Sequence, residues 1–270
     1  MGPALGEPVD VLSQDSLERA VAAAAIAVPP RYLEETASTN TVAAALADEG
    51  APEWTVVAAG HQTAGRGRLG RSWTSAPGRS LLFSVVLRPP LAPEAASLVS
   101  LLAAAEMARA CPPLGEGRVR TKWPNDLMAG HRKLGGVLPE ARVEDGALRH
   151  IVLGVGVNVS MAEADFPPGL GAAATSLSIE GADVRSEELL AGFLCGFRGA
   201  YDPRAPGFAA RAVDRYRSTC ATLGRRVRAR TTGGAVVEGA ASDLDGNGGL
   251  IVERDGERHV VGFGEVVHLD

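Results

Sequence analysis

The spacing of apolar residues predicts an alternation of helices and strands over most of the chain. Apolar residues at helical spacing, bounded by capping residues, prolines and glycines, predict four helices at residues 16–28, 40–49, 93–110 and 186–201. Shorter apolar runs predict strands at residues 55–59, 80–87, 119–123, 133–140 and 149–159. The last two are consistent with a hairpin.

The pattern changes near residue 223 to short alternating strands separated by glycine-rich turns. Five strands are predicted, at residues 225–230, 235–241, 250–253, 258–262 and 265–269. They predict a small five-stranded barrel, which divides the chain into residues 1–222 and 223–270. The turn from Asp243 to Gly248 begins like a calcium-binding loop, but Arg254 stands where that loop needs a glutamate. We therefore interpret it as a hairpin turn.

Composition narrows the class of protein. With 270 residues, 46 % apolar and 22 % charged, the chain is long enough for one catalytic domain of about 200 residues and a small appendage. The net charge of −5 argues against general affinity for nucleic acid. Three cysteines without metal-ligand spacing predict reduced thiols. The first residues contain no basic leader, and no apolar run reaches the roughly 20 residues that span a bilayer. We expect a cytoplasmic protein.

The segment from Gly65 to Trp73 contains three glycines and three arginines. Glycines let a ligand approach the backbone, and guanidinium groups bind phosphate or carboxylate with two hydrogen bonds. The spacing also matches a dinucleotide-binding turn, but residues 72–78 cannot form the helix that such a turn requires. No Gly-Lys-Ser or Gly-Lys-Thr occurs, so a P-loop is absent. The segment predicts an anion-binding loop of another kind.

Lysine is almost missing from this arginine-rich chain. Of the 27 basic residues only Lys122 and Lys133 are lysines, which leaves 27 − 2 = 25 arginines. Both lysines lie in distinctive segments, Lys122–Asp126 and Lys133–Glu140. A compact ammonium fits a tight site that a guanidinium does not. The two lysines are therefore candidates for binding a charged substrate.

These segments occur in one order with Thr36–Asn40 before them and Gly154–Val159 after them. Together they resemble the biotin protein ligases, and the resemblance runs from about Glu35 to the C-terminus. It implies an α+β fold. The catalytic domain would have a mixed, largely antiparallel sheet like that of class II aminoacyl-tRNA synthetases, followed by an SH3-like barrel. The implied activity is ATP-dependent: biotin is activated as biotinyl-5′-AMP and transferred to a lysine of a biotin carboxyl carrier protein.

The same resemblance, with the chemistry of an acyl-adenylate, assigns roles to particular residues. Candidate biotin-binding residues are Ser38, Thr39, Asn40, Gln62, Arg66, Gly67, Arg68, Lys133, Gly135 and Gly136. Candidate ATP- or adenylate-binding residues are Gly65, Arg66, Arg68, Arg71, Trp73, Lys122, Asn125 and Asn158. Candidate catalytic residues are Arg68, Lys122, Asp126 and Lys133. No firm metal ligand is predicted: magnesium would enter with the ATP phosphates, and Asp126 is the one candidate ligand from the protein. Glu265 matches a family glutamate, but His268–Asp270 stand where some members place an arginine.

Other functions stay open at this level. A lipoate–protein ligase would share the architecture and the acyl-adenylate. A non-enzymatic binding module could use the arginine loop as a basic patch, although the net acidity speaks against it. About 30 residues precede the first motif, too few for a DNA-binding winged helix, so we expect no nucleic-acid partner. The expected partner is the carrier domain of a biotin-dependent carboxylase, and the expected state is a monomer or weak dimer.

Overall fold

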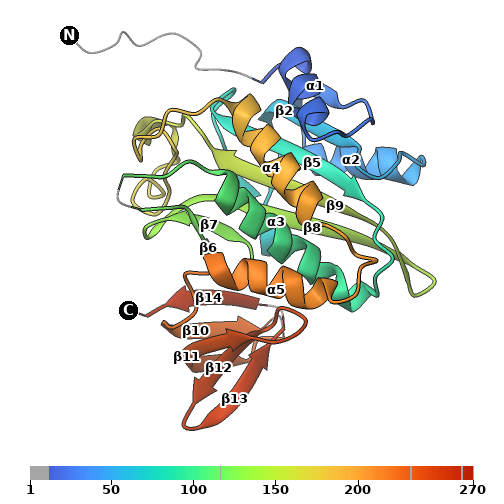
Figure 1. Ribbon diagram of the computed structural model, residues 1–270. Coiled ribbons are helices and arrows are strands. Elements are labelled where there is room, and N and C mark those ends of the chain that lie inside the picture. The colour runs from blue at the N-terminus through green and yellow to red at the C-terminus, as the bar shows by residue number, and fades with distance from the viewer. Residues whose placement is uncertain (1–11, 116, 232, 263, 270) are drawn as a thin grey trace.

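The computed structural model describes residues 12–115, 117–231, 233–262 and 264–269. The amino-terminal residues on which the leader prediction rests lie outside this part of the chain. Figure 1 shows helices packed on a large sheet, with a second, smaller sheet formed by the end of the chain. Among the described residues, no helix combines the length and apolar character needed to cross a membrane.

The large sheet is mixed and mostly antiparallel, which confirms the predicted α+β class. Its strand order is β1-β2-β5-β9-β8-β7-β6, and only β1 and β2 pair in parallel. The strands are β1 (Arg31–Thr36), β2 (Val56–Gln62), β5 (Ser80–Leu87), β6 (Arg120–Lys122), β7 (Asp126–Ala129), β8 (Arg132–Glu144) and β9 (Ala147–Asn158). The predicted hairpin is confirmed as β8 and β9.

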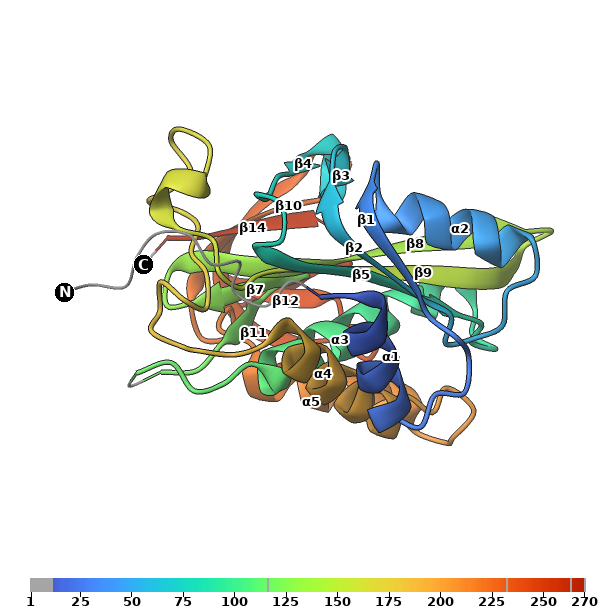
Figure 2. The same ribbon diagram turned by 90° about the horizontal axis from the view of Figure 1, so that it is seen from above.

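Helices cover the two faces of this sheet unequally, as Figure 2 shows. Four lie on one face: α1 (Gln14–Ala23), α3 (Ala96–Ala110), α4 (Ser186–Ala200) and α5 (Phe208–Thr219). The main core lies beneath them, with Phe83 of β5 against Phe193 of α4. On the other face α2 (Thr39–Asp48) packs through Ala43 and Ala47 on a smaller apolar cluster. The part of this second face away from α2 carries no α-helix in Figure 2.

A short hairpin rises above that part of the face in Figure 2. Its strands are β3 (Gly65–Arg66) and β4 (Ser72–Trp73), joined by the one-turn helix η1 (Arg68–Gly70). This is the glycine/arginine loop, and no α-helix follows it, as predicted. Two further short helices are η2 (Pro93–Ala95), which leads into α3, and η3 (Glu163–Asp165).

The C-terminal sheet has five antiparallel strands in the order β13-β12-β11-β10-β14. They are β10 (Arg226–Thr231), β11 (Val236–Leu244), β12 (Leu250–Arg254), β13 (Glu257–Val261) and β14 (Gly264–His268). The indole nitrogen of Trp123 donates to the Gly248 carbonyl over 2.9 Å, and the Trp123 amide donates to the Thr222 hydroxyl over 3.0 Å. One buried tryptophan thus ties this sheet to the β6–β7 turn.

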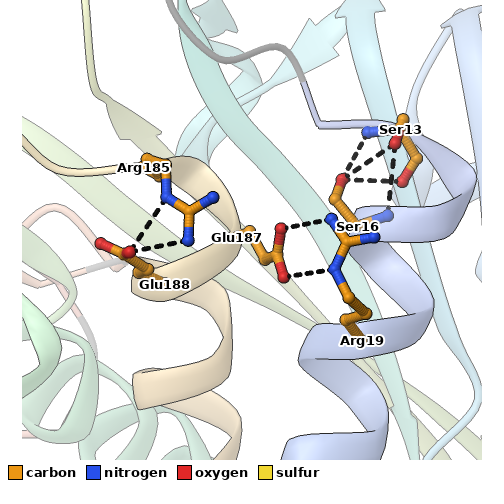
Figure 3. Close-up of polar contacts among 6 residues, drawn as sticks. All are labelled: Ser13, Ser16, Arg19, Arg185, Glu187 and Glu188. Carbon is orange, nitrogen blue, oxygen red and sulfur yellow. Dashed lines mark hydrogen bonds and ion pairs between the residues drawn. The ribbon is translucent and has the colours of Figure 1, made fainter.

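The first helix differs from its prediction at both ends. It begins at Gln14 because Ser13 caps it, with reciprocal hydrogen bonds between Ser13 and Ser16 (Figure 3). It ends at Ala23, well before the prolines, and the chain turns at Ala25 with a φ of 53°. Figure 3 also shows Arg19 bound to Glu187, which fixes α1 against the start of α4. The sequence analysis also missed β1, β7 and α5.

Candidate active site

A cavity of about 310 Å³ opens on the face of the sheet that carries α2 and the glycine/arginine hairpin. The strands β8 and β9 form its floor, the start of α2 one end, and the glycine/arginine loop a wall. Fourteen of the predicted site residues line it: Ser38, Thr39, Asn40, Gln62, Arg66, Gly67, Arg68, Arg71, Trp73, Lys122, Asn125, Asp126, Lys133 and Gly136. Segments far apart in the sequence come together here: Asn40 and Leu138, which are 98 positions apart, are joined by a hydrogen bond.

Three predicted site residues do not line this cavity. The buried amide of Asn158 donates to the Thr175 carbonyl over 2.9 Å and its oxygen accepts from Ser80 over 3.3 Å. That side chain is buried within the fold and does not line the cavity, so its contact with the nucleotide stays a prediction. Gly65 packs against the Trp73 carbonyl and Gly135 against the Gly156 carbonyl, so both glycines allow close backbone packing.

Uncharged polar groups gather at the start of α2. Ser38 is the N-cap residue, yet its side chain makes no capping hydrogen bond, so the hydroxyl is not used by the helix. Gln62 caps the helix instead, because its side-chain oxygen accepts from the Thr39 amide over 2.7 Å. The same oxygen accepts from the Thr39 hydroxyl over 3.1 Å. This end of the cavity suits a small neutral polar group.

Positive charge gathers at the opposite end. The ammonium of Lys133 lies 2.6 Å from Asp126 Oδ1, and Lys122 stands opposite Asp126 in the backbone register of the β6–β7 hairpin. The turn of this hairpin contains a cis peptide bond before Pro124. Burial lowers the pKa of Lys122, an effect that the Asp126 carboxylate opposes. Two ammonium groups and one carboxylate leave net positive charge at this end.

Each arginine of the loop has a partner on a different element. Arg66 forms an ion pair with Glu140 of β8 over 2.8 Å, and Arg71 pairs with Glu265 of β14. Arg68 donates to Asn125 Oδ1 over 3.1 Å, and burial lowers the pKa of its guanidinium. Side chains of the protein therefore bind the three loop arginines before any anion binds, and a bound anion would compete with these side chains.

Two glycines of β9 make room for side chains of the site. A Cβ at Gly154 would lie 2.2 Å from the Asn40 side-chain oxygen, and a Cβ at Gly156 would lie 3.0 Å from the Trp73 indole. The indole nitrogen of Trp73 is buried without a hydrogen-bond partner among the described residues. The Gly-x-Gly pattern thus lets α2 and the loop rest on the sheet.

Replacing Gly154 with alanine is expected to destabilise the fold by about 1–3 kcal/mol, because Asn40 must move and lose its buried hydrogen bonds. Urea unfolding followed by circular dichroism measures this loss. The control is Gly199→Ala in α4, where a Cβ meets no atom within 4 Å. There the stability should stay the same or rise by up to about 1 kcal/mol. Equal stability of both variants would contradict the proposed packing.

The described residues do not form a metal site by themselves. They contain no group of three or more His, Cys, Asp or Glu side chains placed to hold one ion. Asp126 is the predicted metal-ligand candidate, and one of its carboxylate oxygens already accepts a hydrogen bond from Lys133. A magnesium ion that is bound mainly by phosphate oxygens needs only one such carboxylate. These residues therefore suit a magnesium ion only if it enters the site bound to the phosphates of a nucleotide.

The sequence analysis missed part of the lining. Ser72, Trp123, Pro124, Val137, Leu138, Val155, Val266 and Val267 also line the cavity, and so does Glu265, whose role was left in doubt. Alternation along β8 could have pointed to Leu138, which shares its face with Gly136, whereas Val137 and Val155 point into the main core on the opposite face. The approach of β14 could not be read from the sequence, since it depends on how the C-terminal sheet docks.

A mixed sheet with a neutral polar pocket, two lysines and a glycine/arginine loop defines a class of protein that binds a small acid beside an anionic group. The comparison of sequences names that class: residues 32–158 match the biotin/lipoate A/B protein ligase family, and residues 222–269 match the biotin protein ligase C-terminal domain. The chain belongs to the biotin protein ligase family.

Individual relatives agree with this assignment. The chain is 36 % identical over 243 residues to the biotin–[acetyl-CoA-carboxylase] ligase of Mycobacterium tuberculosis, with 87 % of each chain covered. It is 34 % identical to the bifunctional ligase/repressor BirA of Bacillus subtilis, over 82 % of this chain and 68 % of the relative. In fold it is similar to the biotin protein ligase of Aquifex aeolicus solved with biotin and ATP, with a TM-score of 0.69 at 23 % identity, over 88 % and 98 % of the two chains.

Proposed function

We propose that this protein is the ATP-dependent ligase that attaches biotin to the carrier domain of a carboxylase. The biotin carboxylate attacks the α-phosphate of ATP, which forms biotinyl-5′-AMP and releases pyrophosphate. A lysine amine of the carrier then attacks the mixed anhydride, which forms an amide and releases AMP. The observation that carries this proposal is one cavity with a neutral polar end and a cationic end. Relatives named biotin–[acetyl-CoA-carboxylase] ligase support the choice of acid and acceptor.

In this proposal each end of the cavity has its own task. The groups at the start of α2 bind the ureido ring, through Ser38, Thr39 and Gln62. At the other end Lys133 binds the biotin carboxylate beside the α-phosphate, and Lys122 neutralises charge that develops on the phosphate. Gly67 and Gly136 have no side chains, so they leave room for the aliphatic chain of the acid to pass between them.

The loop arginines bind the phosphate side of the adenylate. Arg66, Arg68 and Arg71 then exchange the partners that they have in the free protein, Glu140, Asn125 and Glu265, for phosphate oxygens. Trp73, which already lies along Gly156, forms a flat wall for the nucleotide. A magnesium ion bound to the ATP phosphates would supply further positive charge there.

Asp126 has two tasks in the transfer step. It holds Lys133 through a 2.6 Å hydrogen bond to Oδ1, and its other oxygen can accept the proton that the carrier amine must lose. The anhydride is already activated, so the base needs to contribute little. Asp126 is therefore first a group that positions Lys133.

We also propose a two-domain organisation, with residues 1–222 as the catalytic domain and 223–270 as an SH3-like barrel. The five-stranded antiparallel sheet and the family match at residues 222–269 support the second domain. We propose that the fold of the catalytic domain is similar to that of class II aminoacyl-tRNA synthetases. The barrel contributes Glu265 to the cavity wall. We propose a monomer or weak dimer without a nucleic-acid partner, which works in the cytoplasm with unpaired Cys111, Cys195 and Cys220.

The test is to incubate the full chain with biotin, ATP and magnesium and to detect biotinyl-5′-AMP by mass spectrometry. Biotin-dependent exchange of labelled pyrophosphate into ATP should accompany it, and adding a carrier domain should yield a biotinylated lysine. A parallel reaction contains lipoate instead of biotin. Exchange with lipoate and none with biotin would identify a lipoate-type ligase. Exchange with neither acid would favour a binding module without enzymatic activity.

A further inference from the structure

Ser84 lies directly beneath the polar end of the cavity but does not line it. It stands on β5, opposite Gly154 of β9, and its side chain is 0 % exposed. Its hydroxyl oxygen is 2.8 Å from Thr39 Oγ1 and 2.6 Å from Asn40 Oδ1. A buried hydroxyl with two partners of this kind contributes little to apolar packing. Its hydrogen bonds reach the residues that contact the cavity.

The protons in this cluster can be counted. Ser84 and Thr39 have one hydroxyl proton each, so the cluster has two hydroxyl protons. Each of three contacts requires one such proton: Ser84 to Asn40, Ser84 to Thr39 and Thr39 to Gln62. The Asn40 amide group donates to the Leu138 carbonyl over 3.3 Å, which directs its oxygen, a pure acceptor, at Ser84. In every placement that satisfies two of these three contacts, the Thr39 proton points at an oxygen of the protein, either Gln62 Oε1 or Ser84 Oγ. Thr39 therefore offers the cavity a lone pair.

We propose that Ser84 is a positioning residue that makes Thr39 a hydrogen-bond acceptor, so that the site selects a ligand with an N–H group at this point. The proposal rests on the proposed function, in which the ureido ring of biotin lies at this end of the cavity. Each ring nitrogen of a cyclic urea carries such an N–H. A ring oxygen in its place would set two lone pairs against each other.

Without Ser84, Thr39 is no longer held as a hydrogen-bond acceptor toward the cavity. The Thr39 hydroxyl would lose its 2.8 Å partner and would keep only Gln62 Oε1, which already accepts from the Thr39 amide. Its proton could then turn toward the cavity and serve a ligand oxygen. The consequence is specific: discrimination between N–H and oxygen should fall more than the rate of catalysis.

The experiment compares biotin with its two cyclic carbamate analogues, in each of which one ring N–H is replaced by oxygen. Pyrophosphate exchange gives kcat/KM for each acid, and calorimetry gives Kd. For Ser84→Ala we expect the preference for biotin over the analogue with oxygen facing Thr39 to fall about tenfold. The KM for biotin should rise several-fold, while kcat and the KM for ATP stay within about twofold of the wild type.

The matched control is Ser80→Ala. Ser80 lies on the same strand, is also buried, and its hydroxyl donates to another buried asparagine, Asn158, over 3.3 Å. Its removal should leave the preference between the acids unchanged. A double-mutant cycle adds Thr39→Val, in whose background Ser84→Ala should alter the preference less than about twofold. Thr39→Val by itself should also lower the preference, which keeps the proposal testable if Ser84→Ala does not fold.

The outcomes separate this proposal from the function on which it rests. A wild type that neither binds biotin nor exchanges pyrophosphate would overturn both. A wild type that uses biotin, together with a Ser84→Ala enzyme of unchanged preference, would overturn only the role of Ser84. The same holds if Ser84→Ala lowers the melting temperature and nothing else, because the serine would then serve stability alone.

Discussion

Replacing Lys133 with arginine is expected to slow adenylate formation by about 100-fold or more while the protein stays folded. The Lys133 ammonium lies 2.6 Å from Asp126, and a Cβ at Gly136 would lie 3.9 Å from the Lys133 side chain. A planar guanidinium is wider and cannot take the place of this compact charge. Loss of one aligned donor at a site of developing charge costs a factor of about 10²–10³ in rate.

The measurement is biotin-dependent pyrophosphate exchange under saturating substrates, with circular dichroism as the check of folding. Arg132→Lys is the control, since Arg132 is the next residue on the same strand and pairs with Glu180 rather than with a cavity residue. The control should keep near-normal activity. Near-normal turnover of Lys133→Arg would instead show that the ammonium has no special place in the reaction.

Replacing Arg68 with glycine is expected to release the reactive adenylate. In the free protein Arg68 is partly buried, and its guanidinium donates to Asn125 over 3.1 Å, which places it between the loop and the β6–β7 turn. Its contact with the adenylate phosphate would be charge-assisted, worth about 1.5–3 kcal/mol, so retention should weaken about 10- to 150-fold. Adenylate formation should survive in part, because Lys122 and Lys133 remain.

Escape is measured as biotin incorporation into an unrelated lysine-rich protein, which should rise at least tenfold over the wild type. Labelling of the enzyme itself should stay low, because Lys122 and Lys133 are its only lysines. The control for added loop flexibility is Leu69→Gly, where an exposed side chain already has a φ of 56°. If that variant released as much adenylate, flexibility rather than the guanidinium would be the cause.

The secondary structure was predictable where local signals were strong. The predicted strand at residues 80–87 coincides with β5, and Pro93 begins the helical segment that ends at Ala110. The missed β1 is an edge strand with a polar sequence, Arg31–Thr36, and largely exposed side chains. The missed α5 is rich in arginine. Helix α1 begins earlier than predicted because Ser13, and not Asp15 or Ser16, is its N-cap residue. Burial and capping decided these elements.

Most residue types that line the cavity could be recognised in the sequence, because they are rare or constrained in this composition. Two lysines among 25 arginines, a glycine/arginine loop and a Ser-Thr-Asn trio before a helix are local features, and each can be recognised without knowing its neighbours. The tertiary structure decided which of them meet. It placed Asn158 inside the fold, brought Glu265 of the last strand to the cavity, and set Ser84 beneath Thr39. Those relations depend on strand register and on how two sheets dock, which involve contacts between residues far apart in the chain. A linear pattern does not encode them residue by residue.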